Sequence, residues 1–117
     1  MKKYLVLYQS AAALSGFSVS EMFSKTTPEQ MAAGMAAWHA WHEKSGGALV
    51  DLGAPLDHST TVTAAATAPS KTTITGFSIL QAASMEEAAG LMKNHPHFHT
   101  PGSSVQILEF VPMPSPV

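Results

Sequence analysis

The sequence predicts a single α+β domain whose elements follow one another in the order β-α-β-β-α-β. Helix N-terminal signals occur at Thr27 and Ser84, and short runs rich in β-branched and aromatic residues lie before and after each helix. The chain, residues 1–117, has the length of one ordinary domain and buries enough surface to form a core. This order is that of the ferredoxin-like fold, in which right-handed crossovers place both helices on one face of the sheet.

The first strand is predicted over Lys3–Tyr8. Two tyrosines within a short apolar run suit a strand better than the hydrophobic region of a signal peptide. Gln9–Thr26 is small and polar, and we expect a loop with one helical turn near Val19–Phe23. This segment is predicted to lie as a flap over a bound molecule.

The first long helix is predicted to begin at Thr27, an N-cap with proline directly after it and Gln30 three residues later. It is expected to run through Lys44 and to stop at Gly46, which is followed by a second glycine. The predicted buried stripe has three- and four-residue spacing and consists of Met31, Met35, Trp38 and His42.

The middle of the chain predicts two strands and a hairpin. Ala48–Gly53 is the second strand, and Thr72–Ala82 is the third. We expect Thr60–Thr63 to pair with Thr72–Thr75 as an extended hairpin, with Ala64–Lys71 as its loop.

The second helix is predicted to run from a capping box at Ser84 to about Lys93, because Pro96 disfavours helical backbone at the residue before it. Its expected buried face consists of Met85, Ala88, Ala89 and Met92. Val105–Val111 is the last strand, and the proline-rich tail 112–117 is expected to be frayed.

Both faces of the predicted sheet are apolar. On the first strand one face carries Tyr4, Val6 and Tyr8, and the other carries Leu5 and Leu7. Helices cover only one face, so the other needs a second layer. We therefore predict an isologous homodimer packed sheet against sheet, which is a dimeric α+β barrel with a cavity between sheet and cover.

An ordered series of segments resembles the YCII-related family (YciI-like, DGPF-containing small proteins). The series is MKKYLVLY at the start, then Gly53–Leu56, Gly76–Ala82, Ser84–Ala88 and His95–His97. The resemblance implies a dimeric α+β barrel. Some members carry a histidine–aspartate pair after the first strand and are suspected enzymes. Here Gln9–Ala12 contains no histidine, and Ile74–Phe77 stands near the place of the DGPF tetrapeptide, so that pair does not carry over.

Composition excludes several classes of function. The net charge is −2 and there is no arginine, which disfavours nucleic-acid binding. The absence of cysteine excludes disulfides and thiolate metal sites, and favours the cytoplasm. No segment has the ~20 apolar residues of a membrane span. No glycine-rich nucleotide loop or serine-hydrolase motif occurs, and no cofactor or metal is predicted.

His95, His97 and His99 form the main cluster of reactive side chains. On extended backbone they would project to one side, where neutral imidazoles bind Zn²⁺. A single histidine here would instead serve as a general base. The third interpretation is a polar loop in which His95 satisfies carbonyls at the helix C-terminus.

Two carboxylates, Asp51 and Glu109, interrupt apolar strand patterns. Facing a closed barrel, either would have a raised pKa and serve in acid–base chemistry; at a strand end it would only reach water. The predicted catalytic residues are His95, His97 and Glu109. The predicted ligand-binding residues are Trp38, His42, Asp51 and Phe77.

Together these observations predict a protein that binds a small apolar or mixed-polarity metabolite in a barrel cleft. Histidine–carboxylate acid–base chemistry is one hypothesis for that cleft. The alternative is a non-catalytic ligand-sensing or protein-interaction module, so the question of enzymatic activity stays open.

Overall fold

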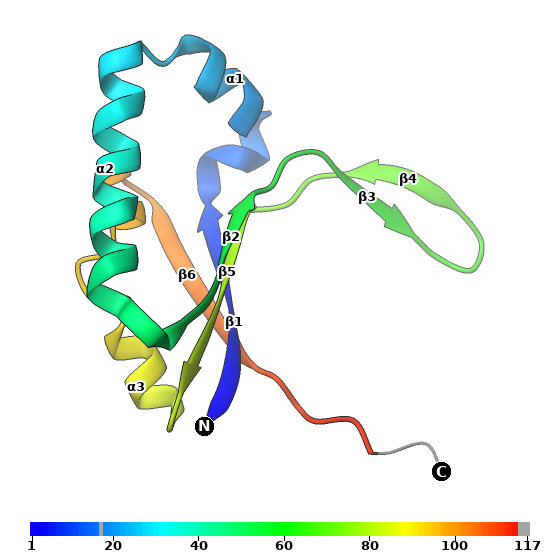
Figure 1. The fold of residues 1–117 in the computed structure, drawn as a ribbon. Coiled ribbons are helices and arrows are strands. Elements are labelled where there is room, and N and C mark those ends of the chain that lie inside the picture. The colour runs from blue at the N-terminus through cyan, green and yellow to red at the C-terminus, as the bar shows by residue number, and fades with distance from the viewer. Residues whose placement is uncertain (17, 115–117) are drawn as a thin grey trace.

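The computed structural model describes residues 1–16 and 18–114; Phe17 and residues 115–117 lie outside the described part (Figure 1). The helices and strands are β1 (Lys2–Ser10), α1 (Val19–Lys25), α2 (Pro28–Ser45), β2 (Leu49–Pro55), β3 (Ser59–Val62), β4 (Thr67–Ser70), β5 (Ile74–Ala82), α3 (Met85–Gly90) and β6 (Ser103–Glu109). Short 3₁₀ helices occupy Ala11–Ser15, Gly46–Ala48 and Pro96–His99. Residues 112–114 of the predicted tail belong to no strand, and its last three lie outside the described residues.

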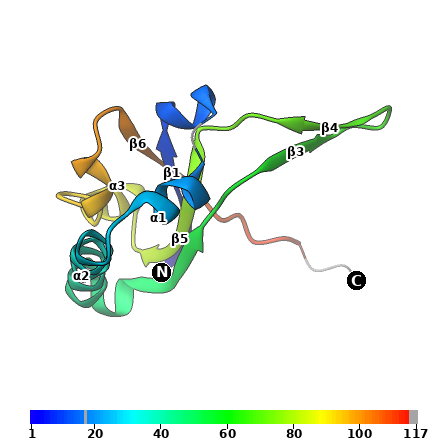
Figure 2. The same ribbon diagram turned by 90° about the horizontal axis from the view of Figure 1, so that it is seen from above.

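The structure is α+β, with a four-stranded sheet in the order β2-β5-β1-β6. All three strand pairs are antiparallel. Figures 1 and 2 place α2 and α3 on the same side of this sheet. The architecture is compatible with the predicted ferredoxin-like fold.

The capping signals predicted α2 correctly. The Thr27 side chain accepts from the Gln30 backbone N–H, and the Gln30 side chain accepts from the Thr27 N–H. The helix ends at Ser45 with Gly46 as its C-cap at a positive φ of 54°, a backbone conformation that favours glycine.

The predicted buried stripe of α2 was correct for Trp38, which packs against the core, and wrong for Met35 and His42. Trp41 is the buried residue, His42 is exposed, and Met35 is 66% exposed. The indole N–H of Trp41 donates to the carbonyl of Leu91, 2.9 Å away, which turns this side of the helix toward the sheet. Trp38 and Trp41 are three residues apart, so the sequence is compatible with either tryptophan at the centre of the buried side of the helix. The hydrogen bond from Trp41 to Leu91 selects Trp41.

The second helix is shorter than predicted. Its cap is present, because the Ser84 side chain accepts from the Glu87 N–H, but α3 ends at Gly90. Ala88 and Met92 are buried as expected, whereas Met85 and Ala89 are exposed. So short a helix presents only one side to the sheet, and its other small and apolar residues face outward.

The predicted register of the hairpin was also wrong. Ser59–Val62 pairs with Thr67–Ser70, not with the start of β5. Thr63 closes the tight turn, because its N–H donates to the Ala66 carbonyl (2.7 Å) and its hydroxyl accepts from the Ala66 N–H (3.1 Å). The result is a separate two-stranded sheet, residues 59–70, which we call the arm.

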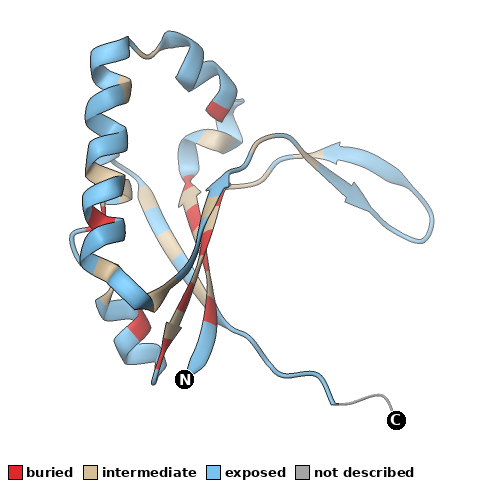
Figure 3. Ribbon diagram, in the orientation of Figure 1, coloured by how far each residue is buried: buried red, intermediate tan, exposed pale blue. Residues whose placement is uncertain are grey.

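One face of the main sheet forms the core with the helices. Buried residues cluster on β1 and β5, as the colouring in Figure 3 shows, and they include Tyr4, Val6, Tyr8, Leu80 and Ala82. The other face carries the alternate residues of the same strands and lies opposite α2 and α3. We call it the open face.

The open face is apolar at its centre and is flanked by polar side chains, among them Lys3, Gln9, Asp51, Gln81 and Gln106. Leu5 and Leu7 on β1 pair in register with Ile79 and Phe77 on β5, and all four are half-buried. Leu108 on β6 lies opposite Leu5 and is 42% exposed. Both sheet faces therefore carry apolar side chains, as predicted, but on the open face these occupy only the centre.

Candidate functional site

A chain of buried polar side chains crosses the core beneath α2. The Tyr8 hydroxyl lies 2.8 Å from Ser78 Oγ and 3.2 Å from His95 Nε2. The Ser78 hydroxyl donates to the carbonyl of Leu52, 2.7 Å away. The chain therefore connects β1, β5 and β2 with the turn after α3.

Hydrogen bonding fixes the direction of this chain. His95 Nδ1 accepts from the His97 backbone N–H at 3.0 Å, so the ring proton of neutral His95 is assigned to Nε2. Nε2–H then donates to Tyr8, Tyr8 donates to Ser78, and Ser78 donates to a carbonyl that only accepts. Each member is satisfied in this single arrangement.

Burial keeps both titratable members of the chain, His95 and Tyr8, neutral. It lowers the pKa of His95 to about 4, with smaller contributions in the same direction from His97 and His99. Burial also raises the pKa of Tyr8 to about 12, against the opposing effect of the Ser78 hydrogen bond. The Trp38 and Trp41 rings lie edge-on to His95, with centroids 4.5 and 4.4 Å away. At neutral pH, His95 is thus a neutral core residue with both ring nitrogens engaged.

His97 and His99 do not join His95 in a common face. Pro96–His99 is a 3₁₀ helix, so the alternate projection expected of extended backbone does not arise. His97 Nε2 lies 2.9 Å from the Gln9 carbonyl and 3.0 Å from the Ser104 carbonyl, and therefore carries the proton. Within residues 1–16 and 18–114 no cluster of three metal-ligating side chains is present.

Glu109 lies at the far end of β1 from the histidines. It pairs in register with Tyr4, whose hydroxyl donates to Glu109 Oε1 over 3.4 Å, and Oε1 lies 3.3 Å from Lys2 Nζ. His97 contacts Gln9, so the histidine and carboxylate ends are separated along the strand by about 17 Å. Of the predicted catalytic residues, His95 and His97 lie together, and Glu109 lies apart from them.

The four predicted ligand-binding residues lie on three different surfaces. Trp38 packs in the core against Tyr8, and His42 is exposed on α2. Asp51 and Phe77 are on the open face, where the register places Asp51 opposite Ile79. Asp51 Oδ1 accepts from the Gly53 N–H at 2.8 Å, within an irregular stretch of β2.

A surface cleft of about 200 Å³ lies at the base of the arm. It is bounded by the segment before α1, the start of α1, and the connections that join the arm to β2 and β5. Its lining residues are Ala13, Gly16, Ser18, Val19, Glu21, Leu56, Asp57, His58, Ser59, Ser70, Lys71, Thr72, Ile74 and Thr75. The predicted flap over a binding site therefore contributes one wall of this cleft.

Asp57 is the central charged group of the cleft. Its Oδ2 accepts from the Ser20 hydroxyl and from the Ser20 backbone N–H, at 3.3 Å for the latter, and lies 3.7 Å from His58 Nε2. The Ser20 hydroxyl bond is the main cause that lowers the pKa of Asp57. This ionised carboxylate ties α1 to the β2–β3 connection.

Sequence reasoning missed this cleft. Asp57 and His58 are adjacent in the chain, which was the available signal for a histidine–carboxylate pair. The partner Ser20 is 37 residues away in sequence, and the folded position of α1 alone brings it to Asp57.

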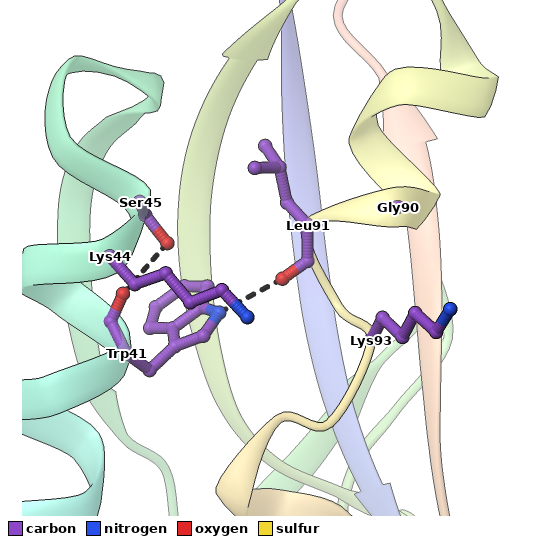
Figure 4. A pocket seen from close by; sticks show the side chains of 6 residues that line it. All are labelled: Trp41, Lys44, Ser45, Gly90, Leu91 and Lys93. Atoms are coloured by element: carbon purple, nitrogen blue, oxygen red, sulfur yellow. Dashed lines mark hydrogen bonds between the residues drawn. The ribbon is translucent and has the colours of Figure 1, made fainter.

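The smaller cavity, about 80 Å³, lies between the ends of α2 and α3 (Figure 4). Trp41 and Leu91 form its inner side through their hydrogen bond, and the Ser45 hydroxyl donates to the Trp41 carbonyl at 2.9 Å. Lys44 and Lys93 also line this cavity. Its volume holds only two or three water-sized groups, at roughly 30 Å³ each.

Comparison with models of known families and with curated proteins finds no match. The resemblance to the YCII-related family therefore remains a prediction from the quoted segments. In the described part of the chain, no helix combines the length and apolar character needed to cross a membrane.

Proposed function

We propose that this chain is a homodimeric, non-catalytic binding protein for a small molecule of mixed polarity. Two copies of the ferredoxin-like sheet would pack as a dimeric α+β barrel of the YCII-related type. The dimer is proposed because of the open face, whose central residues are apolar and face away from the core. The observation that carries ligand binding is the cleft at Asp57.

The open face favours a second copy because its apolar residues form one contiguous band across three strands. Leu7 and Phe77 pair directly, as do Leu5 and Ile79, and Leu108 extends the band to β6. An apolar band of this kind on a sheet marks a contact surface. Packing the band on its own copy about a two-fold axis buries both bands at once.

The cleft favours a small ligand with both apolar and polar groups. Val19, Leu56 and Ile74 supply apolar wall, while Asp57 and Lys71 place opposite charges in the lining. A volume of about 200 Å³ accommodates roughly seven water-sized groups. Such a combination of apolar wall and few oriented polar groups is typical of ligand sites.

The protonation states favour binding over acid–base catalysis. His95 has no free ring nitrogen, and its hydrogen-bond chain ends on the backbone carbonyl of Leu52. The lowered pKa of Asp57 makes it a weak base toward its own partner Ser20. His58 is 88% exposed and contacts the same Asp57 oxygen rather than Ser20.

The dimer is tested by sedimentation velocity on the wild-type chain and two lysine variants. Leu7→Lys places a charge in the middle of the open face, whereas Met35→Lys places the same charge on exposed α2. We expect wild type and Met35→Lys to be dimers and Leu7→Lys to be a folded monomer. Equal sedimentation of all three proteins would contradict the proposed interface.

The ligand is tested by native mass spectrometry of the purified chain, read for a bound small molecule. Lys71→Ala removes a charge from the cleft, and Lys93→Ala removes the same charge from the smaller cavity. We expect the added mass to fall in Lys71→Ala and to remain in Lys93→Ala. A wild-type spectrum without any added mass, or the reverse dependence, would contradict the assignment.

A further inference from the structure

We propose that the arm, residues 59–70, clasps a second copy of the chain and completes the interface that begins on the open face. This inference rests on the proposed dimer. It adds a second interaction surface and assigns which side of the arm contacts the partner.

The arm has little to hold it in place within its own chain. It is a two-stranded sheet with only four paired positions, from Ser59 opposite Ser70 to Val62 opposite Thr67. Thr60, Thr61, Ala68 and Pro69 are exposed, and Val62 is 71% exposed. An isolated two-stranded hairpin is at best marginally stable in water, so an ordered arm of this kind needs a further contact.

The composition of the arm points to a covered surface rather than a solvated one. The run Ser59–Ser70, STTVTAAATAPS, contains no charged residue, and charges begin again only at Lys71. Proteins usually protect exposed strand edges with charged side chains, especially lysine. Apart from Pro69 the arm has no such protection, which is expected if its edge or face is covered in the assembled protein.

The arm leaves the sheet on the side of the open face. In Figures 1 and 2 the helices α2 and α3 lie on one side of the sheet, and the arm and the chain after β6 extend from the other. That chain end also carries exposed apolar side chains, with Phe110 43%, Val111 79% and Met113 88% exposed. A copy seated on the open face would therefore meet the arm and this segment.

The open face is smaller than a stable interface usually is, so a dimer needs a further contact. Four strands about 4.8 Å apart and about seven residues long span roughly 440 Å² of sheet face. A stable interface buries about 800 Å² on each partner. The arm, on which Val62 is 71% exposed, extends beside the sheet and can supply part of the difference.

The extended shape agrees with this arrangement. The radius of gyration is 16.1 Å. A compact chain of this length is expected to have a value of about 13 Å. The exposed residues of the arm and of 110–114 add to the radius without adding core (Figure 3).

The pairing of the arm identifies its contacting side. Thr60, Val62, Thr67 and Pro69 share one side, and Ser59, Thr61, Ala68 and Ser70 share the other. Ser59 and Ser70 are half-buried at the base, where the Ser59 hydroxyl donates to the Ser70 carbonyl at 2.8 Å. The side of Val62 has the larger apolar side chains, and we assign it to the partner.

A pair of double variants tests the assignment with equal added charge. Thr60→Lys with Val62→Lys alters the proposed contacting side, and Thr61→Lys with Ala68→Lys alters the opposite side of the arm. We expect the dimer dissociation constant, measured by sedimentation equilibrium, to rise at least about tenfold in the first protein and less than about threefold in the second. Equal dissociation constants in both would overturn the assignment.

A thiol probe provides a second readout that does not depend on weakening the dimer. The chain has no cysteine, so Val62→Cys and Thr61→Cys each carry a single thiol. On dilution from dimer to monomer, we expect maleimide labelling to become faster for Val62→Cys and to stay constant for Thr61→Cys. Labelling of Val62→Cys that is independent of concentration would overturn the inference.

The two proposals fail in different ways. A wild-type chain that is monomeric at all concentrations contradicts the proposed dimer, and the arm inference with it. A wild-type dimer would contradict the arm inference alone if its dissociation constant and its labelling rate were affected equally by substitutions on the two sides of the arm.

Discussion

The Tyr8 hydroxyl lies 3.2 Å from Nε2 of His95, and this contact joins the first strand to a turn 87 residues later in the chain. It places an imidazole ring in the core, where the Trp38 and Trp41 rings surround it. The contact therefore links the sheet to the turn after α3, and it makes His95, one of the predicted catalytic residues, a buried residue with an assigned tautomer.

Tyr8→Phe should destabilise the protein by about 1–3 kcal/mol, because it leaves Ser78 and His95 without their common buried partner. Chemical denaturation measures this change. Tyr4→Phe is the matched control, since the Tyr4 hydroxyl donates only to a partly exposed Glu109. If Tyr8→Phe lowered the free energy of unfolding no more than Tyr4→Phe, the result would contradict the buried hydrogen-bond chain.

The stability of the protein should fall between pH 6.5 and pH 4. His95 titrates at about 4 in the folded protein against an ordinary value of 6.5, so the unfolded chain binds more protons in this window. The stability contribution is complete above pH 6.5 and is lost as the pH falls through about 4. Its upper limit is about 3 kcal/mol, less any solvent screening of the ring.

The control for this pH dependence is His95→Gln, which keeps a polar side chain but does not titrate. The free energy of unfolding of this variant, measured by urea denaturation at several pH values, should depend much less on pH between 4 and 6.5 than that of the wild type. A wild-type slope that persists unchanged in this variant would show that other groups cause it.

Gly53→Ala should destabilise the fold by more than about 2 kcal/mol. Gly53 has a φ of 80°, and an added Cβ would overlap the carbonyl oxygen of Phe77 on the neighbouring strand. Gly34→Ala, in the middle of α2 with open space around it, should instead stabilise by about 0.5–1 kcal/mol. Thermal unfolding of both variants tests the prediction. A change in unfolding temperature of the same sign in both variants would contradict it.

Ser20→Ala should loosen α1, because the Ser20 hydroxyl and N–H both bind Asp57 and only the N–H would remain. Hydrogen exchange of the amides in Val19–Lys25 should become faster. Ser24→Ala is the control, since the Ser24 hydroxyl donates only to the Glu21 carbonyl of the same helix. Unchanged exchange in Ser20→Ala would show that α1 is held by other contacts.

Local signals in the sequence predicted the elements well. The box at Thr27 and the cap at Ser84 both form, and the alternation on β1 correctly separated Tyr4, Val6 and Tyr8 from Leu5 and Leu7. These signals depend on hydrogen bonds and side-chain periodicities within a few residues, so a single sequence carries them.

Contacts between distant segments were not predictable in the same way. Which side of α2 is buried depends on the Trp41–Leu91 hydrogen bond, and the cleft depends on Ser20 reaching Asp57. The role of His95 depends on Tyr8 lying beneath it. Sequence spacing near these residues was compatible with several arrangements, and only the packed chain selects one.

The mass of the native protein in solution, measured by sedimentation equilibrium across a wide concentration range, tests the central proposal most directly. We expect twice the chain mass of 12.3 kDa at micromolar concentration, with the monomer appearing on dilution. A folded monomer at every concentration would contradict the second copy on the open face.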